Sequence, residues 1–155
     1  MKVFISHSMK NPQLLQALHH IAASQGIHPL IAEHSVDVKN TITVKIQQMI
    51  QGSDLVLVIL TQEGFNSNFV QQEIGYAVDK KPMLIVVERG FETKIAGFIY
   101  GRDPVILDPW NPQPAYARIQ QVLAEQKQKK EQQESIGKLI LAGLGIFFFV
   151  ALTSK

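Results

Sequence analysis

Glu73 is the residue whose type and position point most directly to chemistry. It lies in the stretch 66–79, which is predicted to form a helix. The apolar residues of this helix share one arc of a helical wheel: Val70, Ile74, Ala77 and Val78. Glu73 falls at the edge of that arc, roughly 80° from its centre at about 100° per residue. A carboxylate there is half-buried beside apolar groups, which raises its pKa and costs stability unless a partner compensates.

Two interpretations of this glutamate stay open. A destabilising carboxylate is typical of a functional residue. Alternatively, the stem of Glu73 packs along the edge of the core while its head reaches water and pairs with Lys80 or Lys81. Periodicity alone leaves the structural explanation the stronger of the two.

The elements that would position Glu73 alternate between strand and helix patterns. Short apolar runs predict strands at 3–6, 27–32, 55–60, 83–87 and 104–107. Apolar residues at helical spacing predict helices over 14–22, 42–50 and 66–79, and a further helix from about residue 114. This alternation predicts an α/β fold with a central parallel five-stranded sheet flanked by helices.

Ligands of parallel sheets lie beyond the carboxyl ends of the strands, which selects the loops after residues 6, 32, 60 and 87. The loop after residue 6 contains no glycine, and the chain has neither a G-x-G-x-x-G nor a G-x-x-x-x-G-K-[ST] sequence. A Rossmann dinucleotide site and a P-loop are therefore not predicted. The chain also lacks H-E-x-x-H and cysteine, so no metal site is predicted.

The composition indicates one small domain followed by an apolar tail. The chain has 155 residues, enough for one domain with a hydrophobic core. Its 15 basic and 13 acidic side chains leave a net charge of +2, which is too small to indicate nucleic-acid binding. The amino-terminal sequence MKVFISHS is typical of a strand rather than of a cleavable signal peptide.

The tail at 136–153 is predicted to form a transmembrane helix. From Leu139 to Leu152 it carries no charged residue, but this run is about 14 residues long, whereas about 20 residues span a bilayer. The span therefore needs the residues before Leu139 as well, with Lys138 reaching the headgroups. An interfacial helix and a soluble packing helix are the alternatives.

Lysines upstream of the tail predict its orientation. Lys127, Lys129 and Lys130 precede it and almost no chain follows it, so the positive-inside rule keeps the amino-terminal domain in the cytoplasm. The prediction is a single-pass membrane protein with a carboxyl-terminal anchor. It has a domain at 1–124, a polar helical linker at 125–135 and the anchor at 136–153.

Three blocks of the sequence together resemble the Toll/interleukin receptor (TIR) family. They are KVFISHS at 2–8, SDLVLVILT at 53–61 and SNFVQQEIGYA at 67–77. The likeness covers about residues 2–110 and is closest to the bacterial and archaeal branch of the family. In that family an aromatic residue and a glutamate four residues later form a W-x-x-x-E pattern. Phe69 and Glu73 match these positions, with phenylalanine in place of tryptophan.

The resemblance implies a flavodoxin-like TIR fold and a set of site residues. In NAD-cleaving members the glutamate is the catalytic carboxylate, so Glu73 is the predicted catalytic residue. The predicted substrate-binding residues are Ser6, His7, Ser8, Glu33, His34, Ser67 and Phe69. The first three follow the first strand, where the family's nucleotide pocket begins. Glu33 and His34 lie in the BB loop, which gates the site and mediates assembly; here it reads SVDVKNT and lacks the Pro-Gly turn of many members.

The resemblance also implies an activity, that of an NAD+ nucleosidase which cleaves the bond between nicotinamide and ribose. NAD+ is then a substrate and no cofactor is expected. The predicted role is in defence signalling, activated by self-assembly of TIR domains that the membrane tail concentrates. The main alternative is a non-catalytic signalling or scaffold module that acts through TIR–TIR interactions. A nucleotide-sensing domain or a deoxyribosyltransferase-like enzyme is a further alternative.

Overall fold

The structure, a computed structural model, describes the backbone of residues 1–8, 11–32, 43–92 and 103–153, and the side chains of these residues as far as residue 142. Contacts divide the chain into two units, Met1–Gln121 and Val122–Lys155. The described strands are β1 (Lys2–Ser6), β2 (His28–Ile31), β3 (Leu55–Leu60), β4 (Met83–Glu88) and β5 (Val105–Leu107). The described helices are α1 (Pro12–Ser24), α2 (Val44–Gln51), α3 (Gln62–Phe65), α4 (Asn68–Ala77) and α5 (Gln113–Thr153).

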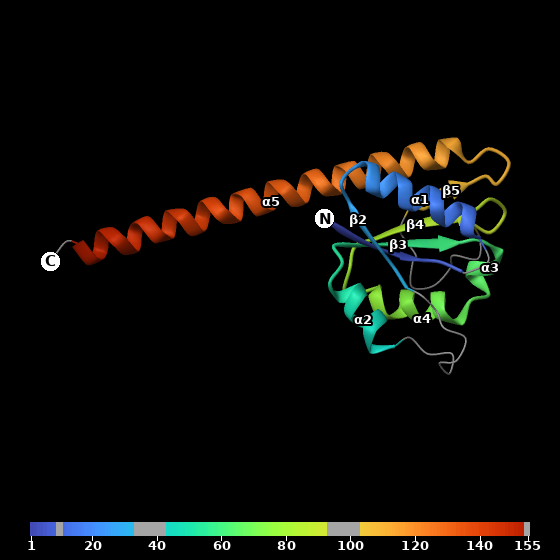
Figure 1. Cartoon of the computed structure of the whole chain (residues 1–155), viewed down its shortest axis with the longest axis horizontal. Helices are drawn as coiled ribbons and strands as arrows, with labels where there is room; N and C mark the ends of the chain where they lie inside the picture. The colour runs from blue at the N-terminus through green and yellow to red at the C-terminus, as the bar shows by residue number, and fades with distance from the viewer. Residues whose placement is uncertain (9–10, 33–42, 93–102, 154–155) are drawn as a thin grey trace. The chain divides into compact units, whose positions relative to one another are not determined.

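The strands form one parallel sheet in the order β2-β1-β3-β4-β5. The central strand β3 pairs with β1 and β4, so that Val56 lies opposite Phe4 on one side and Met83 on the other. Helices α2 and α4 cover one face of the sheet, and α1 with the first turns of α5 covers the other (Figure 1). All six residues of β3 are buried because both faces are covered. The predicted α/β fold with a parallel five-stranded sheet is confirmed.

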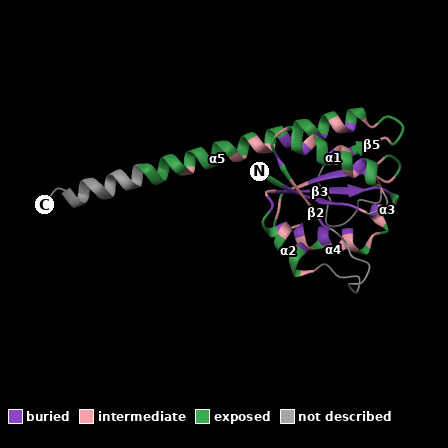
Figure 2. Cartoon of the chain, in the orientation of Figure 1, coloured by how far each residue is buried: buried purple, intermediate pink, exposed green. Residues whose placement is uncertain are grey.

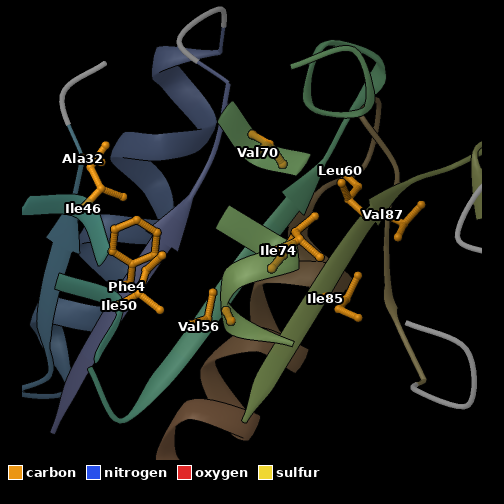
Figure 3. Close-up of a cluster of buried hydrophobic side chains, with 12 residues drawn as sticks. Phe4, Ala32, Ile46, Ile50, Val56, Leu60, Val70, Ile74, Ile85 and Val87 are labelled. Carbon is orange, nitrogen blue, oxygen red and sulfur yellow. The ribbon is translucent and has the colours of Figure 1, made fainter. Parts of the chain in front are cut away.

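The core next to α2 and α4 depends on the alternation of side chains along the strands. Phe4, Val56 and Ile85 point to this face of the sheet and pack with Ile50 and Ile74 of the two helices (Figure 3). Figure 2 shows the consequence, buried strands beneath helices whose outer surfaces are exposed. Since successive side chains alternate between faces, the residue two positions after Phe4 is directed towards α4 as well.

The region before α4 differs from the prediction. The helix predicted at 66–79 is α4, which runs from Asn68 to Ala77, and a further helix that the sequence did not predict, α3, precedes it at Gln62–Phe65. Helix α3 has only four residues, which is too short to show a helical period in the sequence. It lies so close to the end of β3 that a Cβ on Gly64 would collide with the carbonyl oxygen of Ile59. Glycine is therefore required there by the close approach of two backbones.

Helix α5 runs without interruption from Gln113 to Thr153 and so includes the polar stretch 125–135. Ion pairs at i,i+4 spacing link Lys127 to Glu131 at 3.8 Å and Lys130 to Glu134 at 3.4 Å, an arrangement that supports a helix. Among the residues that the structure describes, no helix has both the length and the apolar character needed to cross a bilayer. The transmembrane helix predicted at 136–153 is therefore not supported; its side chains from residue 143 onwards lie outside the described part.

Candidate functional site

Glu73 lies on the side of α4 that packs against the sheet, and its side chain is 0% exposed. Its neighbours on the same helix, Val70, Ile74 and Ala77, are buried as well. The sequence predicted a half-buried carboxylate at the edge of an apolar arc. That prediction was wrong in the extent of burial, because Glu73 is completely buried. Helix α4 contacts both β1 and β3, and the contact with Ser6 at the end of β1 buries the edge of the arc as well as its centre.

The side chain of Glu73 meets Ser6 at the end of β1. The Ser6 hydroxyl donates a hydrogen bond to Oε2 of Glu73 at 2.5 Å, and both residues are completely buried. Ser6 is two residues after Phe4 in β1, so the alternation of the strand directs its hydroxyl to the face that α4 covers. A serine and a glutamate 67 positions apart in the chain are thus brought into direct contact.

Burial controls the charge of the groups at this site. Removal from water raises the pKa of Glu73 from its ordinary 4.5 to about 7, because the ionised form loses its hydration, while the hydrogen bond from Ser6 lowers it. Burial lowers the pKa of His7, and the contact between its Nδ1 and the Ile5 carbonyl, at 3.3 Å, acts in the opposite direction. Near neutral pH both forms of the Glu73 carboxyl group are therefore populated, and burial favours the neutral form of the His7 imidazole.

The position of the site agrees with the rule for ligands of parallel sheets. The strand order β2-β1-β3-β4-β5 means that β2 is added on one side of β1, whereas β3, β4 and β5 are added on the other. The order of strands therefore reverses between β1 and β3. Ligands of flavodoxin-like sheets bind beyond the carboxyl ends of the strands at this switch point. Ser6 is the last residue of β1, so the Ser6–Glu73 contact lies at that point.

The other predicted site residues have different positions. His7 is buried and Ser8 half-buried directly after β1. Phe69 is half-buried in the first turn of α4, one turn before Glu73. Glu33 and His34 lie outside the described residues, so their predicted place in a substrate pocket is not tested.

Ser67 has a structural role at the start of α4. Its side chain caps the helix by accepting a hydrogen bond from the backbone N–H of Val70 at 3.4 Å. Replacing a serine at this position with alanine costs about 1 kcal/mol, because a helix N–H loses its partner. We expect Ser67→Ala to lower the free energy of unfolding by about that amount in urea denaturation. The exposed Ser24→Ala is the matched control, and an equal loss in both variants would contradict the capping role.

Comparison with protein families identifies the fold family. A family model described as TIR domain matches residues 3–140, which is most of the chain. The chain belongs to the TIR domain family. The TIR domains in the structure of the activated Roq1 resistosome, which directly recognizes the pathogen effector XopQ, have a similar fold. Their TM-score is 0.52 at 13% identity, over 81% of this chain and 82% of that one.

At this level of identity, the likeness between this TIR domain and that of Roq1 extends to the fold alone. No match was found among curated proteins. These comparisons confirm the TIR resemblance inferred from the three sequence blocks, but they do not assign the chain to the bacterial and archaeal branch.

Lysines near α4 have partners other than the glutamate of this TIR domain. Lys81 donates from Nζ to the carbonyl oxygens of Gln51 and Ser53, at 2.5 and 2.7 Å. Lys80 donates to the Tyr76 carbonyl at 2.9 Å. The surface pairing of Glu73 with Lys80 or Lys81, which the sequence left open, is therefore replaced by burial against Ser6.

The direct contact between Ser6 and Glu73 is the feature that the sequence did not reveal. Ser6 was predicted to bind substrate from the TIR resemblance and from its place at the end of a buried strand, and neither signal indicated that Glu73 is its partner. Within the described part of this TIR domain, no group of three or more His, Asp or Glu side chains is placed to hold a metal ion.

Proposed function

We propose that this TIR domain cleaves the bond between nicotinamide and ribose in NAD+, with Glu73 as the catalytic carboxylate. The observation that carries the proposal is the buried Ser6–Glu73 pair at the switch point of the sheet. A glutamate whose pKa is raised to about 7 by burial, at the place where parallel sheets bind ligands, is typical of a catalytic group.

The reaction suits a single carboxylate. The bond between ribose C1′ and the pyridinium nitrogen breaks with both electrons passing to nitrogen, so nicotinamide leaves as a neutral molecule and needs no proton from a general acid. Ordinary glycoside hydrolysis uses a second carboxyl group for that purpose. The ionised form of Glu73 would stabilise the positive charge that develops on the ribose and accept hydrogen bonds from its hydroxyls.

Two products are compatible with this step. Addition of water at C1′, with release of a proton, gives ADP-ribose. Attack by a nitrogen of the adenine of the same molecule gives a cyclic product instead. In either reaction Phe69 would form part of the wall of the pocket, while His7 and Ser8, after β1, would contact the nucleotide. Glu33 and His34, in the loop after β2, stay predicted substrate contacts.

Self-assembly is part of this proposal. The fold is similar to that of TIR domains in an activated resistosome, and this likeness supports the idea that copies of the present domain act together. Association of copies would raise their effective concentration and allow one domain to complete the site of its neighbour.

The test is release of nicotinamide from NAD+ by the purified full chain, free in solution and clustered on a carrier. We expect the clustered wild-type protein to release nicotinamide, and Glu73→Gln to reduce the release to that of buffer alone. Asp79→Asn is the matched control, since it also converts a carboxylate to an amide but at an exposed position. Equal activity of the wild type and Glu73→Gln would contradict the catalytic role.

A non-catalytic module that acts through TIR–TIR contacts is the second candidate. The complete burial of Glu73 favours it, because under this alternative the carboxyl group, which is 0% exposed, has a structural role in the packing of α4 on the sheet. Under this alternative the wild-type chain releases no nicotinamide in any clustered form. It nevertheless self-associates in analytical ultracentrifugation.

The membrane anchor at 136–153, with domain 1–124 in the cytoplasm, rests on the sequence alone. A direct test compares the full chain with a chain that ends at residue 135 by flotation with liposomes. Flotation of the full chain only would support the anchor. Equal recovery of both chains in the soluble fraction would contradict it.

A further inference from the structure

A cavity lies at the carboxyl ends of β3, β4 and β5. Its volume is about 410 Å³, within the range of about 300–1,000 Å³ that is usual for small-molecule sites. Its walls come from the start of α1, the β3–α3 junction, the end of β4 and the segment from β5 into α5. None of its described lining residues belongs to the Ser6–Glu73 site.

The alternation of β4 places this cavity on the other face of the sheet. Val87 points into the core beneath α2 and α4, so the following residue, Glu88, is directed towards the face that α1 and α5 cover. Glu73 reaches the sheet from α4, on the opposite face (Figure 1). The cavity is therefore separate from the candidate NAD+ site.

The polar wall of the cavity offers hydrogen-bond acceptors and negative charge. Glu63 and Glu88 line it, and no lysine or arginine is among its described lining residues. Glu88 is held in place because its Oε2 accepts a hydrogen bond from the backbone N–H of Gln62 at 3.0 Å. A carboxylate has about four lone-pair sites, so this bond leaves it able to accept more.

Two helix amino termini at the cavity do not make it an anion site. The side chain of Asn11 accepts from the N–H of Leu14 at 3.3 Å, and Thr61 accepts from the N–H of Gly64 at 3.2 Å. These caps occupy N–H groups that would otherwise bind an anion. The charge available to a ligand in this cavity is consequently that of the two carboxylates.

Apart from Gln13, the remaining lining residues are apolar or aromatic, and two of them flank an exposed tryptophan in the chain. The apolar lining residues are Leu14, Leu107, Pro109 and Pro112, joined by the ring of Tyr116. Trp110 stands in the chain between the two prolines and is 96% exposed. Its turn is ordered, since the Trp110 N–H donates to Oδ1 of Asp108 at 2.9 Å and Asp108 pairs with Arg89 at 3.3 Å. An exposed indole face on an ordered turn attracts cations.

We infer that this cavity binds a small organic cation, an alkylammonium or guanidinium compound with a short apolar chain. Glu63 and Glu88 receive the charged group, and the proline and leucine side chains contact the hydrocarbon part. The inference does not depend on cleavage of NAD+, because the two sites share no residue.

The test uses spermidine and agmatine as probes against the full chain. Trp110 is the only tryptophan of the sequence, so its fluorescence reports on this region alone, and titration calorimetry gives an independent measure. We expect saturable binding of at least one probe, weakened by added salt because the attraction is between charges. Glutarate and 1,5-pentanediol, an anion and a neutral molecule of similar length, should not bind.

The matched variants remove two charges each. We expect the double variant Glu63→Gln/Glu88→Gln to raise the Kd at least about tenfold, with its fold verified by circular dichroism. The control Asp79→Asn/Asp103→Asn has the same change in net charge at exposed positions outside the cavity and should bind as the wild type does. Absence of saturable heat with both probes, equal binding of glutarate, or an unchanged Kd in the first double variant would overturn the inference.

Discussion

Glu73→Gln is expected to stabilise the domain increasingly as the pH rises, by about 2–3 kcal/mol more at about pH 8 than at about pH 5. The pKa of Glu73 is raised to about 7 in the folded protein, above its ordinary 4.5. Between these values the folded state binds more protons than the unfolded state, so the stability of the wild type falls as the pH rises and is lowest above the folded pKa. Glutamine fills nearly the same volume and has no charge to bury.

The measurement is the free energy of unfolding from urea titrations at several pH values. The exposed Asp79→Asn is the control, because it removes a carboxylate without relieving any burial. A difference between Glu73→Gln and the wild type that stays constant across this pH range would mean that Glu73 is not held in an unfavourable environment. A gain in stability accompanied by loss of activity would be the usual trade-off of a functional site.

Ser6→Ala is expected to raise the pKa of Glu73 further and to destabilise the protein most at alkaline pH. The Ser6 hydroxyl donates to the carboxylate at 2.5 Å in a fully buried setting, and hydrogen bonds to charged groups contribute about 1.5–3 kcal/mol. Without this bond the ionised form is disfavoured more strongly. At low pH the carboxyl group is protonated, so the loss should fall to about 0.5–1.5 kcal/mol, the value for a neutral hydrogen bond.

Two measurements separate this role of Ser6 from simple packing. Carbon-13 NMR of the Glu73 carboxyl group gives its pKa directly, and its midpoint should move above about 7 in Ser6→Ala. The pH profile of kcat/KM for nicotinamide release should move in the same direction, because it reports the pKa of the free enzyme. A midpoint that is unchanged or lower would contradict the contribution of Ser6 to the charge of Glu73.

The architecture of the domain was predictable because its signals are local. Each of the five strands is a short apolar run, and the longer helices show apolar residues at helical spacing. Parallel pairing follows from the alternation of strands and helices. The exception is α3, whose four residues carry no periodic signal and whose position depends on Gly64 fitting against the carbonyl oxygen of Ile59.

The candidate site was predictable only in part. The wheel and the family pattern selected Glu73, and both use residues within one helix. The burial of the Glu73 carboxyl group was not predictable in this way, since it depends on how closely α4 packs on β1 and β3. The pairing of Ser6 with Glu73 depends on strand order and on the face of β1 that α4 covers.

By itself, the sequence determined the α/β class, the place of Glu73 beside an apolar helix face and the resemblance to TIR domains. The tertiary structure alone decided that Glu73 is completely buried, that Ser6 is its hydrogen-bond partner and that a separate acidic cavity opens beyond β3, β4 and β5. The physical reason is the range of the interactions. Periodicity records contacts within one element, whereas desolvation, a hydrogen bond across 67 positions and a cavity walled by several elements exist only after the elements have packed together.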